Sequence, residues 1–327
     1  MIDGRNVLTS VVIPTYNRSD QLIRLLAALA TQVDVDFEVV VADDGSGDDT
    51  VVRARALADT VPYPLTVVTS PTNTGPAATR NRGWRRARGD LIAFIDDDCV
   101  PAPFWLVNLL SGFDHADLVI GRTRPPDDQL DQIGPFSSYL DIADGEGFLS
   151  CNIAYRRSVL EAVDGFDDEA FPLHNGEDTD LGLRALEAGF RDRFVDEALA
   201  FHDVHPSDFG AHLRRVRHLE GIVALVARHP VARHRPFRAG WFLRSVDKAV
   251  LICWVTVAGL VARPRGRSAW LAAAVGASLY VWQFPRSHYR PRSRGEWATS
   301  VPLGFAADSW AVAVMIRSSV RHRTILL

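Results

Sequence analysis

The residues with the clearest chemistry are three consecutive carboxylates, Asp96, Asp97 and Asp98, in the run FIDDDCV at 94–100. They follow a short apolar stretch with the composition of a buried strand. Adjacent carboxylates repel one another, which raises their pKa values unless a cation is bound. Carboxylate oxygens are ligands that Mg²⁺ and Mn²⁺ prefer. We therefore expect a divalent-metal site here, against the alternative of a solvated acidic turn.

A second acidic segment, VVVADDGSGDDT at 39–50, places Asp44 just past another apolar run. A fixed carboxylate at this point could accept a hydrogen bond from the N–H edge of a nucleobase. The alternative is an Asp-Gly turn in which Ser46 or Asp48 caps the following helix. The segment by itself favours neither interpretation.

An arginine-rich segment, NTGPAATRNRGWRRARGD at 73–90, predicts a helix whose amino end lies near Gly75. Arg80 would lie one or two turns into this helix, where its guanidinium could pair with a diphosphate. The other arginines are expected on a solvated face of the same helix, at Arg82, Arg85, Arg86 and Arg88.

The elements that position these residues alternate short apolar runs with amphipathic stretches from Leu8 to Phe94. Repeated β-α-β units predict an α/β fold, in which a mostly parallel sheet is flanked by helices. Strands are expected around 8–14, 37–44, 65–70 and 89–95, with helices near 20–31 and 50–58. Ligands of such sheets bind at the carboxyl ends of the strands, where Tyr16, Asp44 and Asp96 lie.

The composition divides the 327-residue chain into two electrostatically opposite parts. Residues 1–202 hold 34 Asp and Glu against 17 Lys and Arg, and residues 203–327 hold 6 against 19. An acidic part that handles an anionic nucleotide needs a divalent cation, whereas a basic, apolar part suits an anionic lipid surface. We find no motif for reading nucleic acid and expect no nucleic-acid partner.

Three cysteines, Cys99, Cys151 and Cys253, are odd in number and widely spaced. This pattern fits neither a disulfide framework nor a zinc site and favours a reducing cytosol. The start MIDGRNVLTS lacks the apolar core and cleavage site of a secretory signal. We therefore expect the first part of the chain in the cytoplasm.

The region after about His205 changes to Arg, His, Ala, Val and Trp, so we predict domains at 1–205 and 206–327. Its uncharged runs, 249–262 and 268–284, are shorter than the roughly 20 residues that a transmembrane helix needs. A two-span hairpin would also place the connecting RPRGR across the membrane from the cytoplasm, against the positive-inside tendency. An interfacial or re-entrant membrane anchor fits better, with soluble helical packing as the alternative.

Tryptophans and a third apolar stretch add to the prediction of membrane association. Indole rings favour the headgroup level of a bilayer, and the basic region carries Trp241, Trp254, Trp270 and Trp282. Asp308 interrupts the third stretch, 297–316. We expect a peripheral or monotopic protein on the cytoplasmic side of a membrane.

The motifs SVVIPTYNR, VVADDGS, NTGPAATRNRG, FIDDDC and GEDTDLGLRALEAG, in this order, resemble those of the family 2 glycosyltransferases with the GT-A fold. The order and spacing match over about residues 8–202. The resemblance implies a GT-A catalytic domain, a Rossmann-like nucleotide-sugar-binding fold, followed here by a C-terminal α-helical region. It implies a hexosyl- or related transferase that uses a divalent metal, Mg²⁺ or Mn²⁺, and inverts the anomeric carbon.

The resemblance also implies roles in donor binding. Tyr16, next to Pro14, would stack on the base, Asp44 would bind the imide edge, and Arg80 would approach the nucleotide. Asp97 would lie near the ribose. The metal on the diphosphate would be held by Asp98 with Asp96, and His202 is a further ligand by analogy with some relatives.

For the acceptor side, the match assigns Asp178 as general base with Glu177 beside it, and places Asn152 near the acceptor or sugar. Alternatives stay open for three of these residues. Asp178 would also serve as a helix cap, His202 as an ordinary surface or core histidine, and Asn152 as a hydrogen-bonded residue of a buried strand.

Two other functions use a similar fold. A sugar-nucleotide-forming nucleotidyltransferase should show a Gly-rich basic loop after the first strand, where this chain has PTYNRSDQL. A non-catalytic membrane-bound scaffold should have lost one of Asp44, Asp98 or Asp178, and all three are present. The basic tail favours a lipid-linked acceptor or a cell-envelope glycan, while Asp44 suits uracil, thymine and guanine equally.

Overall fold

The computed structural model describes residues 8–145, 147–171, 176–234, 244–262, 267–287 and 293–326. The chain separates into two compact units. The first contains Met1–Gln129 and Tyr139–Asp203, and the second contains Leu130–Ser138 and Val204–Leu327. The predicted domains at 1–205 and 206–327 remain a proposal. The units differ from them in the segment Leu130–Ser138, which belongs to the second unit although it lies within the first two hundred residues.

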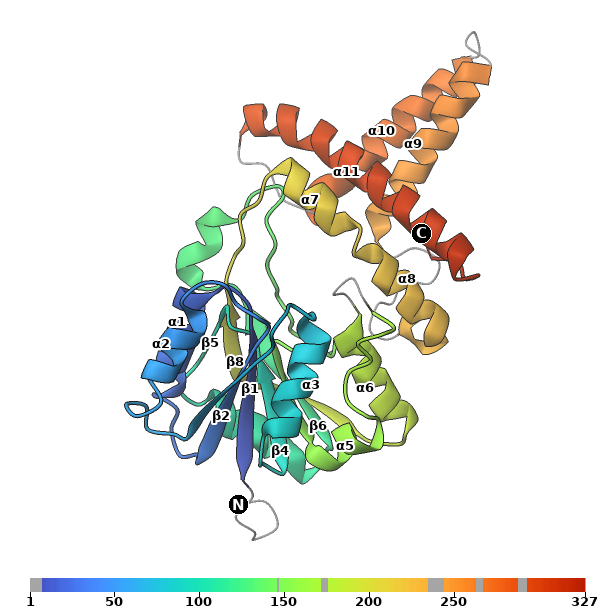
Figure 1. Ribbon diagram of the computed structural model, residues 1–327. Coiled ribbons are helices and arrows are strands. Elements are labelled where there is room, and N and C mark those ends of the chain that lie inside the picture. Colours follow the sequence, from blue (N-terminus) through green and yellow to red (C-terminus); the bar gives the residue numbers. More distant parts are fainter. Residues whose placement is uncertain are drawn as a thin grey trace. The chain divides into compact units, whose positions relative to one another are not determined.

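An eight-stranded sheet forms the centre of the first unit, in the order β3-β2-β1-β4-β7-β6-β8-β5 (Figure 1). The strands β3, β2, β1 and β4 are parallel, as the β-α-β pattern predicts. β7 runs antiparallel to both of its neighbours, β4 and β6. The bounds are β1 Thr9–Thr15, β2 Phe37–Asp43, β3 Leu65–Thr69, β4 Leu91–Ile95, β5 Cys99–Pro101, β6 Leu118–Arg124, β7 Asn152–Arg156 and β8 Asp192–His202.

Six helices of the first unit flank the sheet. The helices expected near 20–31 and 50–58, and the one expected to begin near Gly75, are confirmed as the first three of the set. The set comprises α1 Ser19–Leu29, α2 Thr50–Ala56, α3 Pro76–Arg86, α4 Trp105–Ser111, α5 Arg157–Ala162 and α6 Glu177–Glu187. Two 3-10 helices, Gly112–Asp114 and Asp127–Gln132, complete the described elements of this region.

The alternation of side chains along β1 distributes the helices over two faces of the sheet. Val11 and Ile13 point to the face where Leu22 and Leu25 of α1 pack with them in the main core. Val12 points to the opposite face and meets α3. There, a Cβ added at Gly83 would lie 2.4 Å from Val12 Cγ1, so α3 approaches the sheet more closely than a side chain would allow.

The short strand β5 follows the acidic triplet and pairs antiparallel with the end of β8. In this register Cys99 lies opposite His202, and the Asp203 N–H donates to the Asp98 carbonyl over 3.0 Å. Residues about one hundred positions apart are therefore held side by side at one edge of the sheet.

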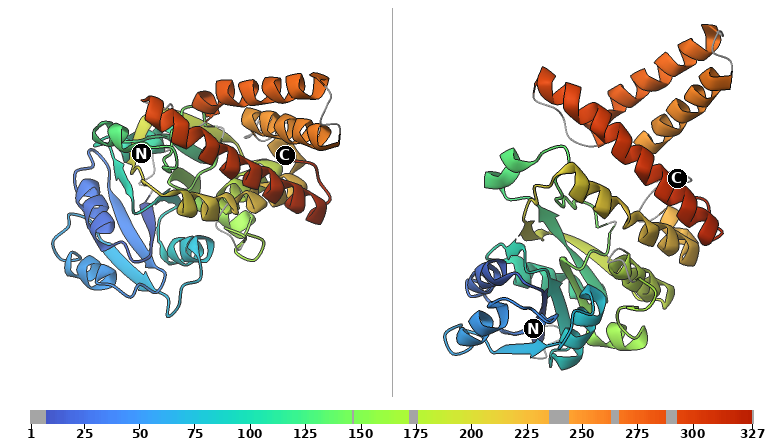
Figure 2. Two further views of the ribbon diagram at one scale, coloured as in Figure 1. Left: turned by 90° about the horizontal axis from the view of Figure 1, so that it is seen from above. Right: turned by 45° about the horizontal axis from the view of Figure 1, so that its top comes forward.

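The second unit is helical, with α7 Phe209–Val216, α8 Leu219–Arg228, α9 Ser245–Ala262, α10 Arg267–Ser287 and α11 Arg294–Arg321, and the 3-10 helix Pro230–Arg233. α9 and α10 lie side by side as a hairpin, and α11 contacts both of them together with α7 and α8 (Figure 2). The two uncharged runs predicted at 249–262 and 268–284 are thus the two helices of the hairpin.

Charged side chains are buried where the hairpin meets α11. Asp247 and Asp308 are almost fully buried, and Arg244 lies within 2.7 Å of the first and 3.0 Å of the second. The Tyr280 hydroxyl donates to Asp308 over 2.8 Å. Asp308, expected to interrupt an apolar stretch, therefore has its charge balanced inside the helical unit.

The apolar character of this unit gives weak support for membrane contact. Among the described residues, α11 is the helix with the length and composition to cross a bilayer, yet 44% of its most apolar 18-residue window is buried. Burial inside the helical unit explains the apolar composition of α11 as well as contact with lipid would. Trp254, Trp270 and Trp282 are exposed on α9 and α10, whereas Trp241 and most of RPRGR lie outside the described residues.

Candidate functional site

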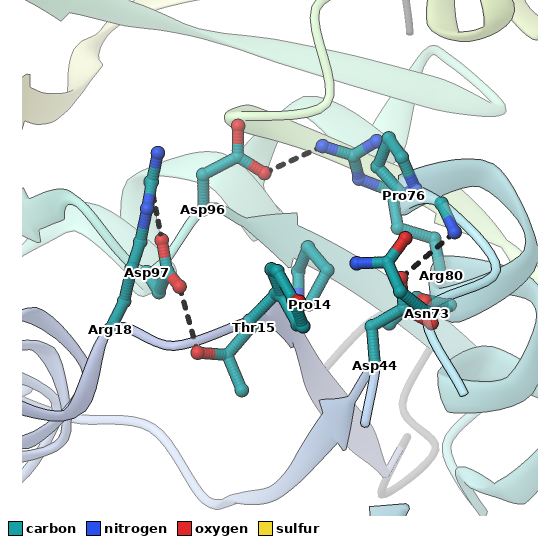
Figure 3. Close-up of a pocket in the computed structure, with 12 residues that line it drawn as sticks. Pro14, Thr15, Arg18, Asp44, Asn73, Pro76, Arg80, Asp96 and Asp97 are labelled. Carbon is teal, nitrogen blue, oxygen red and sulfur yellow. Dashed lines mark hydrogen bonds and ion pairs between the residues drawn. The ribbon is translucent and has the colours of Figure 1, made fainter. Parts of the chain in front are cut away.

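A cavity of about 320 Å³ opens beside the carboxyl ends of β1, β2 and β4, where such sheets bind ligands. Figure 3 shows its acidic and basic side chains facing one another across the opening. Twelve residues line it, six of them predicted from the sequence: Pro14, Thr15, Tyr16, Arg18, Asp44, Asn73, Gly75, Pro76, Thr79, Arg80, Asp96 and Asp97.

The loop after β1 is shaped by Asn17, whose backbone is left-handed with φ 51°. Asparagine tolerates this conformation better than most residues because its side chain bonds locally. Here the side-chain oxygen accepts from the Gly47 N–H over 2.8 Å, and the Asn17 N–H donates to Ser46 Oγ over 2.8 Å. These bonds join the loops after β1 and β2 and leave Tyr16 exposed at the cavity.

Asp44 is buried and holds the loop that leads into α3. Its Oδ1 accepts from the Thr74 N–H and hydroxyl over 2.8 and 2.7 Å, and its Oδ2 accepts from the Gly75 N–H over 2.8 Å. The carboxylate thus fixes the amino end of α3 next to the cavity. Its hydrogen bond to a nucleobase stays a prediction.

The arginine face predicted on α3 is confirmed for Arg85 and Arg86, which are exposed, and is wrong for Arg82. Arg88 is also exposed, but it lies after the end of α3 and pairs with the buried Glu38 at 2.7 Å. Arg82 is half-buried, donates to the Asp43 carbonyl over 3.2 Å and to the Thr74 hydroxyl over 2.9 Å. It lies on the side of α3 that faces the end of β2, so it supports the loop around Asp44.

The acidic triplet is divided among three partners. Asp96 is half-buried and receives Nη2 of Arg80 at 2.7 Å. Asp97 accepts from the Thr15 hydroxyl at 2.8 Å and from Arg18 at 2.9 Å (Figure 3). Asp98 accepts from the same Arg18 nitrogen at 2.6 Å. Asp96 therefore contacts Arg80, whereas Asp97 and Asp98 share Arg18.

The protonation of Asp97 reflects a balance of opposing effects. Burial raises its pKa, the Arg18 guanidinium lowers it, and the neighbouring Asp98 raises it again. The result is a pKa of about 6. Arg18 experiences the opposite balance, since burial lowers its pKa while Asp97 and Asp98 raise it above the ordinary value.

Among the described residues, Asp98, Cys99 and His202 form a group whose potential metal-ligand atoms lie within 4.8 Å of one another. His202 Nε2 is 3.4 Å from Asp98 Oδ1. Burial raises the pKa of the Cys99 thiol well above its usual value, so Cys99 is a neutral and poor ligand. An oxygen and a nitrogen donor beside a second carboxylate suit Mn²⁺ or Mg²⁺. Asp96, predicted as a ligand, lies outside this group and faces Arg80.

Arg80 connects the triplet to the acidic pair at the start of α6. It is 5% exposed, with Nη1 at 3.3 Å from Glu177 Oε1 and its guanidinium over the Phe166 ring at 5.7 Å. Burial lowers its pKa, but Asp96 and Glu177 raise it above the ordinary value, so the side chain is a permanent cation. A buried charge of this kind stays in place because it is paired on both sides.

Asp178 lies in the first turn of α6, directly after Glu177. Gly176 precedes them with φ 107°, a conformation that glycine adopts without strain, and the four residues before it lie outside the described chain. The Thr179 N–H donates to Asp178 over 2.7 Å and the Ser150 N–H over 3.4 Å. Burial and the Glu177 charge raise the pKa of Asp178 to about 7, although Arg80 and these N–H groups lower it.

Asn152 is not brought to the cavity. It is 1% exposed, accepts from Trp105 Nε1 over 2.7 Å, and donates to the Arg122 and Ala198 carbonyls over 2.8 and 2.9 Å. These bonds use its amide to join β7 to β6, β8 and α4. An acceptor contact of Asn152 stays a prediction, and its observed bonds are those of a structural residue.

Six of the twelve lining residues escaped prediction as site residues, and two of these, Thr15 and Arg18, contact the acidic triplet. Both stand in the motif SVVIPTYNR, on either side of Tyr16 and Asn17. A polar residue that ends a buried strand, and a cation three positions later, are the signal that could have drawn attention to them. Their partners are about eighty positions away, and no pattern in the sequence specifies that pairing.

Comparison with known proteins agrees with this geometry. Residues 10–163 match the model of glycosyl transferase family 2, and residues 148–284 match that of glycosyl transferase family group 2. The glycosyltransferase AglE of Haloferax volcanii is 30% identical over 217 residues, which cover 63% of this chain and 69% of that protein. The chain belongs to glycosyltransferase family 2.

A second family 2 relative, the pre-mycofactocin glycosyltransferase of Mycobacterium tuberculosis, is 31% identical over 241 residues. The match covers 68% of this chain and 48% of the relative, so the chain spans about half of that protein's length. Among solved structures, the mannosyltransferase PcManGT of Pyrobaculum calidifontis, in complex with GDP-Man and Mn²⁺, has a TM-score of 0.68 at 19% identity. It covers 97% of this chain and 88% of its own, which establishes the shared fold.

Proposed function

We propose that this chain transfers a sugar from a nucleoside diphosphate donor to an acceptor hydroxyl, with a divalent metal and with inversion at the anomeric carbon. The observation that carries the proposal is the position of Arg80. This buried cation contacts Asp96 at the cavity and Glu177 beside Asp178, so it links the donor side to the candidate base. In a transfer reaction the donor and the acceptor must be held next to each other, so the donor site and the base must lie close together.

The cavity supplies the donor site of the proposal. Tyr16, next to Pro14, offers an exposed ring to a base, and Asp44 offers a fixed carboxylate to its N–H edge. Asp97 is the nearest acid for ribose hydroxyls, and Arg80 provides charge for the diphosphate. PcManGT was solved with GDP-Man, which supports a nucleotide sugar of this general class for a shared fold.

Asp98 and His202 are the proposed metal ligands. They combine a carboxylate oxygen with an imidazole nitrogen 3.4 Å away, and the neighbouring Asp97, which lines the donor cavity, adds negative charge. A bound Mn²⁺ or Mg²⁺ would stabilise the charge that develops on the departing diphosphate. Asp96 does not contact this pair; its negative charge is balanced by Arg80 at 2.7 Å.

Asp178 is the proposed general base. With a pKa of about 7 its carboxylate is both available and basic enough near neutral pH to accept the proton of the acceptor hydroxyl. The acceptor oxygen then forms a bond to the anomeric carbon as the bond to the diphosphate oxygen breaks. One displacement from the face opposite the leaving group inverts the configuration. Glu177 keeps Arg80 in place and sets the electrostatic environment of Asp178.

The second unit leads us to propose a lipid-linked acceptor or a cell-envelope glycan and a location at the cytoplasmic membrane surface. Indole rings on α9 and α10 are exposed, including Trp254 at 50%, Trp270 at 63% and Trp282 at 57%. Tryptophan at the surface of an apolar helical hairpin favours the interface of a bilayer. Residues 203–327 also carry the basic excess that anionic lipids attract.

A thermal-shift panel tests the donor and metal sites together. UDP-, dTDP-, GDP- and CMP-sugars are compared with MnCl₂ and with EDTA, and the Asp98→Asn variant is the control. A ligand at about 100 times its Kd stabilises the folded state by about 2.7 kcal/mol, which such a scan detects. We expect one nucleotide class to raise Tm with Mn²⁺ and to lose most of the effect with EDTA or in the variant. If the donors raise Tm as much with EDTA as with MnCl₂, the metal site is contradicted.

A further inference from the structure

Arg18 makes an unusual contact in which one guanidinium nitrogen lies between two adjacent carboxylates. Its Nη1 is 2.9 Å from Asp97 Oδ1 and 2.6 Å from Asp98 Oδ2. The two acids are each 5% exposed, whereas the Arg18 side chain is 41% exposed. Buried acids are therefore neutralised by a cation that reaches them from the solvent side.

The two arginines of the cavity differ in the freedom that their surroundings leave them. The side chain of Arg80 is 7% exposed and is held by acids on two sides, Asp96 and Glu177. Arg18 precedes α1, is held on one side only, and lines the same cavity. Arg18 can thus leave its carboxylates without carrying a buried charge through the protein, and Arg80 cannot.

A divalent cation held by Asp98 and His202 would bind Oδ1 of Asp98, which faces His202 Nε2, while Arg18 contacts Oδ2 of the same carboxylate. The two positive groups would then lie a few ångströms apart at a buried carboxylate, where they repel each other strongly. The doubly charged ion attracts the carboxylate more strongly and would displace the guanidinium. Since Arg18 lines the cavity, the displaced group remains within reach of an anionic ligand there.

We propose that Arg18 is an exchangeable counter-ion: it neutralises Asp97 and Asp98 before the metal binds, yields Asp98 to the metal, and then pairs with the anionic donor. The proposal rests on the proposed metal-dependent transfer and goes beyond it by assigning a positioning role to Arg18. It implies that Arg18 weakens metal binding in the absence of donor, and that metal and donor favour each other's binding.

The decisive measurement is Mn²⁺ affinity without donor, from the EPR signal of free Mn²⁺, in the parent and in Arg18→Gln. Loss of the competing cation should tighten Mn²⁺ binding at least tenfold, because it removes the repulsion between the guanidinium and the metal. Arg18→Lys keeps the charge and should stay close to the parent. Arg85→Gln is the matched control, because Arg85 is 48% exposed and pairs with Asp164 on the surface. Unchanged or weaker Mn²⁺ binding in Arg18→Gln overturns the proposal.

Asp98→Asn separates this inference from the function on which it rests. Asp98→Asn should abolish Mn²⁺ binding in the parent and in Arg18→Gln alike. If the parent binds no Mn²⁺ with or without donor, the metal-dependent function fails and the counter-ion role fails with it. If the parent binds Mn²⁺ through Asp98 and Arg18→Gln binds it no more tightly, the function stands and the counter-ion role alone is wrong.

A second measurement uses the parent protein and needs no folded variant. Phenylglyoxal modifies accessible arginines, and peptide mass spectrometry reports the rate at Arg18. Mn²⁺ should accelerate modification of Arg18 by at least threefold, and addition of the donor diphosphate should slow it again, while Arg85 stays constant. A rate at Arg18 that Mn²⁺ leaves unchanged or lowers contradicts displacement.

Discussion

At the scale of single residues, the site shows how environment differentiates chemically identical carboxylates. Asp97 and Asp178 both have raised pKa values, but Asp97 contacts the cation Arg18, whereas Asp178 follows the acid Glu177. The guanidinium lowers the pKa of Asp97, and the Glu177 charge raises that of Asp178, which suits the general-base role that we propose for Asp178. Asp44 differs again, since its carboxylate accepts hydrogen bonds from N–H groups of the loop before α3.

Replacing Asp178 by Asn removes the proposed base and keeps the shape of the side chain. We expect donor affinity within about threefold of the parent and a loss of transfer of roughly 10²–10⁴-fold, the usual contribution of a positioned base. Single-turnover assays with radiolabelled donor and isothermal titration with the nucleotide separate the two effects. Transfer at the parental rate would place the base elsewhere.

The pH dependence follows from the raised pKa of Asp178. The base acts as the carboxylate, so activity should rise with pH up to about 7 and level off above it. Glu177→Gln removes a neighbouring negative charge that raises this pKa, so the acidic limb of kcat/KM should move to lower pH. Profiles of both proteins at saturating Mn²⁺ test this, and a shift to higher pH in the variant would refute the assignment.

At the scale of secondary-structure elements, the site depends on close packing and short pairings. β5 has three residues, yet its pairing with β8 is what holds His202 next to Asp98. α3 presents Arg80 to the cavity only because it lies close to the sheet at Gly83. α6 places its acidic pair in its first turn, where the positive end of the helix dipole stabilises carboxylates.

The packing of α3 predicts a strong effect of Gly83→Val. The new Cβ would lie 2.4 Å from Val12 Cγ1, so α3 or β1 must shift, at a cost of about 1–3 kcal/mol in the free energy of unfolding. Gly47→Val is the control, because nothing lies within 4 Å of a Cβ at that position. Urea unfolding of the three proteins measures the difference. Equal midpoints would show that the close approach is not required.

At the scale of the whole molecule, an acidic α/β unit is followed by a basic helical one. The first contains the cavity that we propose as the donor site, and its excess of acids would favour a cation beside an anionic donor. The second exposes apolar and indole side chains on α9 and α10 while burying Asp247 and Asp308, which pair with the half-buried Arg244. This division is consistent with the lipid-linked acceptor that we propose.

Vesicle flotation of the full chain tests this division. We expect recovery with anionic vesicles, weaker recovery with neutral ones, and a loss in the double variant Trp254→Glu and Trp270→Glu, since each charge opposes interfacial burial. Val52→Glu provides the control, because Val52 is 71% exposed on α2 of the first unit. Undiminished flotation of the double variant would argue against α9 and α10 as the membrane contact.

The sequence by itself determined the α/β class, the positions of β1 to β4 and of α1 to α3, and half of the residues that line the cavity. Buried parallel strands have continuous apolar runs, and the polar groups at their ends share one edge of the sheet, so Tyr16, Asp44 and Asp96 were predictable neighbours. Arg80 was predictable from its place near the amino end of a helix. These features depend on local periodicity, which a single chain displays directly.

The tertiary structure alone decided how those residues are paired. It separated Asp96 from the group formed by Asp98 and His202, turned Asn152 into an internal structural residue, and revealed the partners of Arg18. It also assigned Leu130–Ser138 to the helical unit. Each of these outcomes depends on contacts between residues far apart in the sequence, and on which way a side chain points at the end of a strand. The physical cause is that strand register and side-chain packing depend on the whole core. Local sequence patterns do not specify them.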